Sequence, residues 1–233
     1  MKIGLLADIH GNASALGAIL SSAKQNKIDR LLIAGDFVGY YFEPRKVLEM
    51  LSTWKYDAVR GNHEEMLDAC ARKPELLSEV RKKYGPGIDI ALKELQLNQI
   101  NFLSNLPHPL DILIDNVNFR LCHGSPVDLN RYLYPDVDLS VIRNLNTGDA
   151  DVVVFGHTHY PTLKYIENKL FINPGSVGQP RNGQRGAHWA IYQTKTREVE
   201  FKVEEYDSRI LINNCRLKCP AIPYLAEILE RRK

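Results

Sequence analysis

The first sixty residues alternate short apolar runs with segments of helical periodicity. Runs at 2–7, 30–34 and 56–60 predict strands, and segments 13–24 and 44–51 carry apolar side chains at helical spacing. This β-α-β-α-β order is typical of parallel strands joined by helical crossovers. Each of the three strands is followed by polar residues that can bind a metal ion, so the same stretch indicates where a site would form.

The rest of the chain adds helices and then more strands. Residues 64–106 predict a helical insert with helices at 64–72, 74–84 and 88–106. Further strands are predicted at 111–114, 117–121, 151–155, 162–166, 169–172, 188–193 and 199–203, with a helix at 139–145. We expect one α/β domain spanning 1–233, a four-layer αββα sandwich of two mixed β-sheets flanked by helices. The tail at 206–233 is predicted to hold one or two helices, split by Pro220 and Pro223.

A buried strand leads directly into two histidines. Val152 to Phe155 is an unbroken β-branched and aromatic run, which suits a strand covered on both faces, and it ends at Gly156 before His157 and His159. In extended chain, residues i and i+2 point the same way and lie roughly 6.5 Å apart. Two imidazoles placed in this way would bind one metal ion, or one each of a pair about 3.5–4 Å apart.

Other metal-binding side chains follow other predicted strands. Five of the seven histidines fall at such ends, and the full candidate set is Asp8, His10, Asp36, Asn62, His63, His123, His157 and His159. Taken singly, each has a structural explanation, since Asp8 can cap a helix and Asp36 or Asn62 can form a turn. Together they offer mixed nitrogen and oxygen ligands without thiolate, which suit Mn²⁺, Fe, Zn²⁺, Co²⁺ or Ni²⁺. The carboxylate of Asp36 has two oxygens and so could bridge two ions.

Composition limits the class of protein. The net charge of +2 does not require nucleic acid as a partner, although a local basic groove stays open. No apolar run approaches about 18 residues, so no membrane span is expected, and the apolar start is too short for a signal peptide, whose core usually has about 7–15 residues. The four cysteines form no Cys-x-x-Cys pair, which favours reduced thiols and a cytoplasmic location.

Five ordered motifs carry a family resemblance. The motifs are Asp8-x-His10, Gly35-Asp36-Phe37-Val38-Gly39, Gly61-Asn62-His63-Glu64, His123-Gly124 and Gly156-His157-x-His159. They resemble those of the calcineurin-like metallophosphoesterases, and the match runs from Met1 to about Val203. The opening Asp8-Ile9-His10-Gly11-Asn12 and the loop Asn173-Pro174-Gly175-Ser176 look closest to the small bacterial and archaeal phosphodiesterase branch. The resemblance implies an αββα sandwich with two divalent metal ions, with manganese expected, at one sheet edge.

The resemblance also assigns roles to individual residues. It places Asp8, His10 and His159 on one metal ion, and Asn62, His123 and His157 on the other, with Asp36 bridging both. His63 is not a ligand in this scheme. It faces the substrate, where it protonates the leaving oxygen or stabilises charge in the transition state.

The predicted function is hydrolysis of a phosphate ester, most simply a nucleotide or other small diester, by a hydroxide that bridges the two ions. A phosphomonoesterase, such as a protein phosphatase or a dinucleoside polyphosphate hydrolase, is the alternative, and a non-catalytic metal-binding scaffold is a third.

The sequence does not identify the substrate-binding residues or the oligomeric state. Residues 40–42 depart from the branch pattern and are expected to wall the substrate side, where their rings would stack a base or simply pack. Arg181 and Arg185 would reach a phosphate or lie in a solvated loop, and His108 is predicted in an exposed loop.

Overall fold

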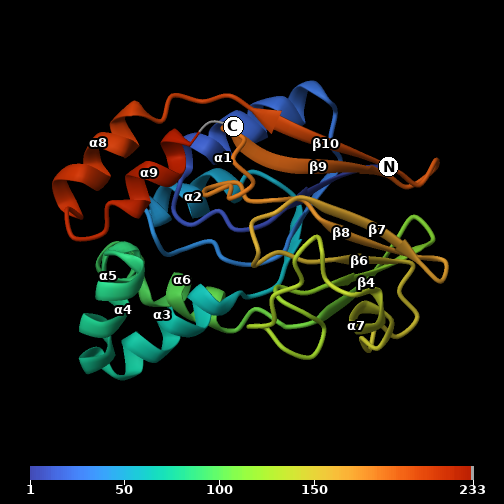
Figure 1. Cartoon of the computed structure of the whole chain (residues 1–233), viewed down its shortest axis with the longest axis horizontal. Coiled ribbons are helices and arrows are strands. Elements are labelled where there is room, and N and C mark those ends of the chain that lie inside the picture. Colours follow the sequence, from blue (N-terminus) through green and yellow to red (C-terminus); the bar gives the residue numbers. More distant parts are fainter. Residues whose placement is uncertain (232–233) are drawn as a thin grey trace.

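Two five-stranded mixed sheets pack face to face, with helices on the outer faces (Figure 1). The computed structural model describes residues 1–231. In the first sheet the order is β10-β9-β1-β2-β3, formed by β1 (Lys2–Leu6), β2 (Arg30–Ile33), β3 (Tyr56–Ala58), β9 (Ala187–Gln193) and β10 (Glu198–Glu204). Strands β1, β2 and β3 are parallel, whereas β9 runs antiparallel to both β1 and β10. The β-α-β-α-β start therefore forms as predicted.

The second sheet has the order β4-β5-β6-β8-β7. Its strands are β4 (Leu110–Ile114), β5 (Val117–Leu121), β6 (Val152–Val154), β7 (Thr162–Ile166) and β8 (Lys169–Asn173). The central strands β5, β6 and β8 are parallel, and antiparallel β4 and β7 form the two edges. The predicted αββα sandwich of two mixed sheets is confirmed.

Alternation along β1 shows how the layers are built. Ile3 and Leu5 are buried between the two sheets, whereas Leu6 packs on the opposite face among residues of the helical layer. That layer contains α1 (Ala13–Gln25) and α2 (Pro44–Leu51). On the outer face of the second sheet, α7 (Leu139–Arg143) and the buried Leu133 cover β6 and β8. The carboxyl ends of β1 and β6 come to the same edge, where the N–H of His157 donates to Asp8 Oδ2 at 3.1 Å.

The helical insert continues from the third strand. It consists of α3 (Asn62–Arg72), a 3-10 turn (Pro74–Leu76), α4 (Leu77–Tyr84), α5 (Gly87–Glu94) and α6 (Leu97–Ser104). The prediction of one helix over 88–106 was wrong, because Leu95 is extended with ψ 143° and ends α5. Gln96 then caps the next helix, with its N–H donating to the side chain of Gln99 at 2.9 Å. The apolar periodicity runs on across this break and hides it.

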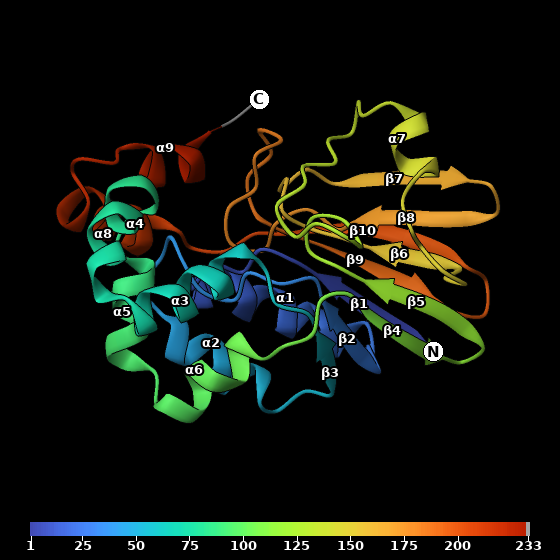
Figure 2. The same ribbon diagram turned by 90° about the horizontal axis from the view of Figure 1, so that it is seen from below.

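The C-terminal tail packs on its own chain. Helices α8 (Arg209–Lys218) and α9 (Tyr224–Glu230) lie against the loop at 40–42, beside the helical insert (Figures 1 and 2). Leu225 is fully buried there, and its carbonyl accepts a hydrogen bond from the Tyr41 hydroxyl at 3.3 Å. The last two residues of the basic C-terminal tip lie outside the described residues. Within residues 1–231 no helix is long and apolar enough to cross a membrane.

Candidate metal centre

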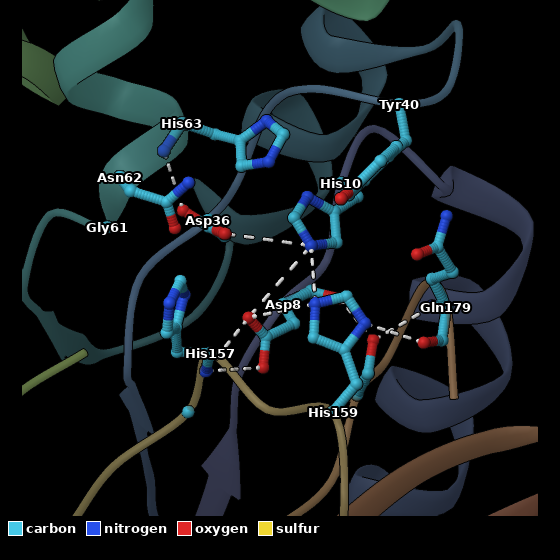
Figure 3. Close-up of polar contacts among 12 residues, drawn as sticks. Asp8, His10, Asp36, Tyr40, Gly61, Asn62, His63, His157, His159 and Gln179 are labelled. Atoms are coloured by element: carbon cyan, nitrogen blue, oxygen red, sulfur yellow. Dashed lines mark hydrogen bonds and ion pairs between the residues drawn. The ribbon is translucent and has the colours of Figure 1, made fainter. Parts of the chain in front are cut away.

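All eight candidate side chains meet at one edge of the sandwich, and none is left outside the cluster. Figure 3 labels all of them except His123. They come from the carboxyl ends of five strands: Asp8 and His10 after β1, Asp36 after β2, Asn62 and His63 after β3 at the start of α3, His123 after β5, and His157 and His159 after β6. Each is no more than 8% exposed. Buried polar groups are costly unless they form hydrogen bonds with one another or coordinate a bound ion.

The backbone at this edge is held in an uncommon conformation. Asp8, His10, Asp36, His157 and His159 all have positive φ, between 52° and 68°. This left-handed region is unfavourable for residues with a side chain, and such residues concentrate at functional sites. Backbone hydrogen bonds between the loops hold them in place, since the N–H of Asp8 donates to Gly35 O at 3.1 Å and that of His10 to Asp36 O at 2.9 Å.

One half of the cluster places two imidazole lone pairs against each other. The Nδ1 atom of His10 donates to Val38 O at 3.1 Å, and that of His159 donates to Gln179 O at 2.7 Å. Since a neutral imidazole carries only one proton, both Nε2 atoms are acceptors. These two atoms lie only 3.1 Å apart, with Asp8 Oδ1 at 3.5 Å from His159 and 3.9 Å from His10. Acceptors that face one another in a buried space fit a cation between them.

The other half gathers ligand atoms around Nε2 of His123. Its Nδ1 atom donates to Ala34 O at 2.7 Å, which directs Nε2 into the cluster. There Nε2 meets Asn62 Oδ1 at 2.9 Å, His157 Nδ1 at 3.1 Å and Asp36 Oδ2 at 3.3 Å. Nitrogen and oxygen donors without sulfur suit a first-row divalent metal ion. The residues present therefore fit two cations, one in each half.

The ligand atoms form three compact groups, each within 4.8 Å. The groups are Asp8 with His10 and His159, Asp8 with Asp36 and His123, and His10 with Asp36 and His63. Asp8, His10 and Asp36 each belong to two of these groups, so the groups overlap in one continuous cluster. Because His63 joins the third group, distance alone also admits it as a ligand, contrary to the role that the sequence predicted.

One nitrogen of the His63 ring is left without a hydrogen bond. The His63 backbone N–H donates to Asp36 Oδ1 at 2.9 Å, but among residues 1–231 its buried Nδ1 has no hydrogen-bond partner, as is also the case for Nε2 of His157. Gly39 leaves the room that the ring occupies, since a Cβ there would lie 1.9 Å from His63 Nδ1. His63 stands at the N-terminus of α3, where the helix dipole favours an anion. An unpartnered nitrogen at this position suits contact with a substrate.

In the metal-free cluster, burial and neighbouring charges shift the pKa values of the ligand side chains in different directions. Burial lowers the pKa of His10 and His159 well below the ordinary value, so both imidazoles are neutral. Burial alone would also lower the pKa of His123, but the charge of Asp36 and the hydrogen bond to it raise that pKa to about 9. Burial raises the pKa of Asp8 to about 8. Without metal, a proton neutralises Asp8 and another makes His123 positive, so these two protons offset negative charge that bound cations would otherwise offset.

Two supporting residues were missed by the sequence analysis. The buried carboxylate of Glu64 accepts backbone N–H groups of Gly61 at 2.7 Å, of Asp36 and Phe37 at 2.8 Å each, and of Val38 at 3.3 Å. His108 is not in an exposed loop as predicted: it is half-buried, and its Nε2 accepts the N–H of His123 at 3.0 Å. Glu64 stands in a quoted motif and so offered a signal, whereas nothing near His108 in sequence indicated this contact.

Arg181 also lies closer to the cluster than a solvated loop would place it. It is half-buried, and its guanidinium donates to the Tyr40 hydroxyl at 3.1 Å and to Gln179 Oε1 at 3.0 Å. After burial, the charge of Arg181 is the largest cause that lowers the pKa of His159. Arg185 instead donates to Glu230 O at 3.0 Å through Nε, and so holds the tail.

Fold and site define a phosphoesterase of the calcineurin type. The family model of the calcineurin-like phosphoesterase superfamily domain matches residues 1–197, and the chain belongs to this family. The protein MJ0912 from Methanocaldococcus jannaschii is 30% identical over 223 residues, covering 88% of each chain. Phosphodiesterase YfcE from Escherichia coli is 26% identical over 223 residues, covering 91% of this chain and 99% of YfcE.

A solved structure shows the same fold over nearly the whole chain. The hypothetical protein PH1004 from Pyrococcus horikoshii has a TM-score of 0.85 at 23% identity, covering 98% of this chain and 97% of PH1004. The predicted family is confirmed by the family model and by relatives named phosphodiesterases. Family and site together support a metal-binding hydrolase of phosphate esters.

Proposed function

We propose that this protein is a phosphodiesterase with two divalent metal ions at the strand-end cluster. The observation that carries the proposal is the convergence of ligand atoms in two halves: the acceptors His10 Nε2 and His159 Nε2 face each other 3.1 Å apart in one half, and in the other His123 Nε2 lies 3.1 Å from His157 Nδ1 and 2.9 Å from Asn62 Oδ1. Asp8 would complete the first set of ligands, Asn62 would complete the second, and Asp36 lies within reach of both. Bound ions would supply an activated water and positive charge for the phosphoryl oxygens.

His63 is the proposed acid or charge-stabilising residue. In the metal-free protein, burial lowers its pKa to about 4, so the imidazole is neutral near pH 7. The negative charge of a bound phosphate would raise this pKa, because an opposite charge favours the protonated form. His63 would then donate a hydrogen bond or proton to the leaving oxygen. The guanidinium of Arg181, whose charge acts on His159, would hold a phosphoryl oxygen beside the cluster.

The test compares three single variants for metal content and turnover. His63→Ala is expected to keep about two equivalents of metal per chain while turnover of bis(p-nitrophenyl) phosphate falls about 100- to 10,000-fold. Asp36→Asn should lose both metal and turnover. Asp149→Asn, an exposed aspartate away from the cluster, is the matched control and should change neither. Metal loss from His63→Ala would make His63 a ligand, and no turnover by the wild type with Mn²⁺, Ni²⁺, Co²⁺ or Fe²⁺ would overturn the proposal.

A phosphomonoesterase is the main alternative, because the same cluster would serve either reaction. The diester assignment is supported by relatives that are named phosphodiesterases. Equal enzyme concentrations assayed on bis(p-nitrophenyl) phosphate and on p-nitrophenyl phosphate should show the larger kcat/KM for the diester. A larger value for the monoester would reverse the assignment. A scaffold role is disfavoured because His63 and the complete predicted ligand set are present and buried together.

A further inference from the structure

Exposed apolar side chains lie on two edge strands at one side of the sandwich. Leu163 and Tyr165 of β7 are 48% and 71% exposed, and Phe201 of β10 is 37% exposed. Within residues 1–231 each of these strands pairs with a single neighbour, β8 or β9. An edge strand with unpaired backbone groups and an apolar face can pair with another chain. Figure 2 shows β7 as the outermost strand on this side, with β10 set back behind it.

The exposed side chains lie on the inner faces of the two sheets. Residues directly opposite each other in an antiparallel pair share one face of the sheet. Tyr165 is opposite Leu170, and Phe201 is opposite Ala190. Both Leu170 and Ala190 pack in the core between the sheets. The inner face therefore continues from the core onto β7 and β10, where it becomes exposed, and a strand added to each edge would extend the core over these residues.

The directions of the two edge strands decide how two copies of the chain can fit. Strand β10 runs parallel to β1, since β9 is antiparallel to both, and β7 is antiparallel to β8 and therefore to β6. Both β1 and β6 lead into the metal-ligand cluster, so β7 and β10 run in opposite directions. A two-fold axis parallel to the strands would place β7 of each copy beside β10 of the other, antiparallel to it. Such a contact is self-complementary and closes as a dimer.

The register of this pairing follows from the rows of residues across the sheets. In the first sheet Tyr192 is opposite Val199, and in the second a row of paired residues runs from Phe119 on β5 to Tyr165 on β7. The rings of Phe119 and Tyr192 meet between the sheets with centroids 5.3 Å apart, so the two rows lie at about the same level. The axis would then bring Tyr165 opposite Val199 of the partner subunit.

The same register matches side chains on both faces of the joined sheets. On the inner face it sets Leu163 opposite Phe201 of the partner subunit, so that apolar groups meet. On the outer face it sets Lys164 opposite Glu200 of the partner subunit. Glu200 contacts Lys202 of its own strand at 3.3 Å through Oε1, which leaves Oε2 to accept from Lys164. Pairing of β7 with a second β7 about Lys164 would instead place two lysines opposite each other, which is unfavourable.

We propose that the chain forms a two-fold dimer in which β7 and β10 of one copy extend the two sheets of the other. The occupant of the exposed edges is a second copy, because β10 supplies both the apolar inner face and the acidic outer residue that β7 requires. Rotation about an axis along the strands preserves their direction. Both metal-ligand clusters therefore open at the same end of the dimer, and neither lies in the interface.

Sedimentation of the full chain at micromolar concentration tests the dimer. The wild type should have twice the mass of one chain. Tyr165→Lys places a charge in the interface and should be monomeric, with unchanged circular dichroism because Tyr165 is 71% exposed. Leu113→Lys is the matched control, since Leu113 is 66% exposed on β4 at the other edge of the same sheet, and it should remain dimeric. A monomeric wild type, a dimeric Tyr165→Lys or a monomeric Leu113→Lys overturns the proposal.

Charge exchange tests the register. Lys164→Glu sets two carboxylates opposite each other at two symmetric places, and should raise the dissociation constant of the dimer at least about tenfold. Glu200→Lys should have a similar effect, because it sets two ammonium groups opposite each other. The double variant Lys164→Glu/Glu200→Lys restores opposite charges and should return the dissociation constant to within about threefold of the wild-type value. Unchanged single variants, or a double variant that dissociates as readily as they do, would rule out this pairing and the dimer built on it.

Discussion

The imidazole of His108 supports the metal centre without entering it. It accepts the backbone N–H of His123 at 3.0 Å, so His108→Ala would leave that N–H without its partner. We expect the free energy of unfolding to fall by about 1–3 kcal/mol and metal affinity to fall about tenfold, as for other groups that orient a ligand. Urea unfolding and metal titration measure both. His108→Gln keeps an acceptor oxygen and should recover much of each loss, and identical behaviour of the two variants would rule out this role.

The carboxylate of Glu64 gathers four backbone N–H groups on its two oxygens, which fastens the Asp36 loop to the start of α3. In Glu64→Gln an NH₂ group replaces one oxygen and faces donors. We predict a loss of at least about 2 kcal/mol in the free energy of unfolding, since hydrogen bonds to charged groups contribute about 1.5–3 kcal/mol each.

Glu65 provides the control for this experiment. It is exposed on the same turn of α3, and its ion pair with Arg60 spans 3.8 Å. Exposed pairs contribute about 0–1 kcal/mol, so Glu65→Gln should leave urea unfolding nearly unchanged. Equal destabilisation by the two substitutions would show that the buried carboxylate has no special part in holding the loop.

Sequence alone located the candidate ligands because each follows a strand that could be recognised locally. Asp36 and His123 come from different sheets, and their meeting was predicted from the clustering of histidines at strand ends together with the family resemblance. Contacts between loops follow no such pattern. His108 reaches His123 across a hairpin, and Tyr132 reaches His157 from a loop without periodicity. Such contacts depend on the paths of loops, which sequence patterns do not encode.

At the scale of elements, the tail supports the loop next to the site. Leu225 of α9 is fully buried against residues 40–42, while Leu217 of α8 is 72% exposed. Leu225→Ala should lower the free energy of unfolding by about 2–5 kcal/mol through the lost burial and the cavity that remains. Leu217→Ala should change it by less than about 0.5 kcal/mol. Thermal unfolding of the two variants side by side measures the difference, and equal midpoints would show that α9 is only loosely attached.

Helix boundaries show where sequence patterns were insufficient. The apolar spacing of residues 88–106 is helical on both sides of Leu95, so periodicity predicted one helix. The break lies in the Gln96-x-x-Gln99 cap, a weak signal because glutamine is a poor capping residue compared with serine or aspartate. By contrast, α2 begins at Pro44, whose fixed φ favours the first turn, and its bounds agree with the prediction.

At the scale of the whole molecule, metal binding should be coupled to both stability and pH. Ions that bind only the folded chain raise its thermal midpoint. Because Asp8 and His123 have pKa values of about 8 and about 9 without metal, each binds a proton at lower pH that must leave when ions enter. Metal affinity should therefore increase as pH rises through this range. Calorimetric scans with and without Mn²⁺, oxygen excluded, should show a larger rise in midpoint at about pH 8.5 than at about pH 6.5.

A chelator provides the reverse experiment. Removing the ions should lower the thermal midpoint back to the metal-free value, and the drop should be smaller at the lower pH, where protons on Asp8 and His123 already offset the buried charge. A drop that grows as the pH falls would contradict this assignment of protons.

The proposed metal ligands come from two sheets, and this affects the stage at which the protein can take up metal ions in a cell. Ligands from β1, β2 and β3 meet those from β5 and β6 only after both layers have stacked, and the first layer is complete only when β9 and β10 have joined β1. Until the layers stack, only a fraction of the ligand set can gather in one place, and a partial set holds a divalent ion poorly. We therefore expect metal ions to bind after the chain has folded. When metal is scarce in the cell, the protein would then be folded but inactive, and later addition of metal would activate it.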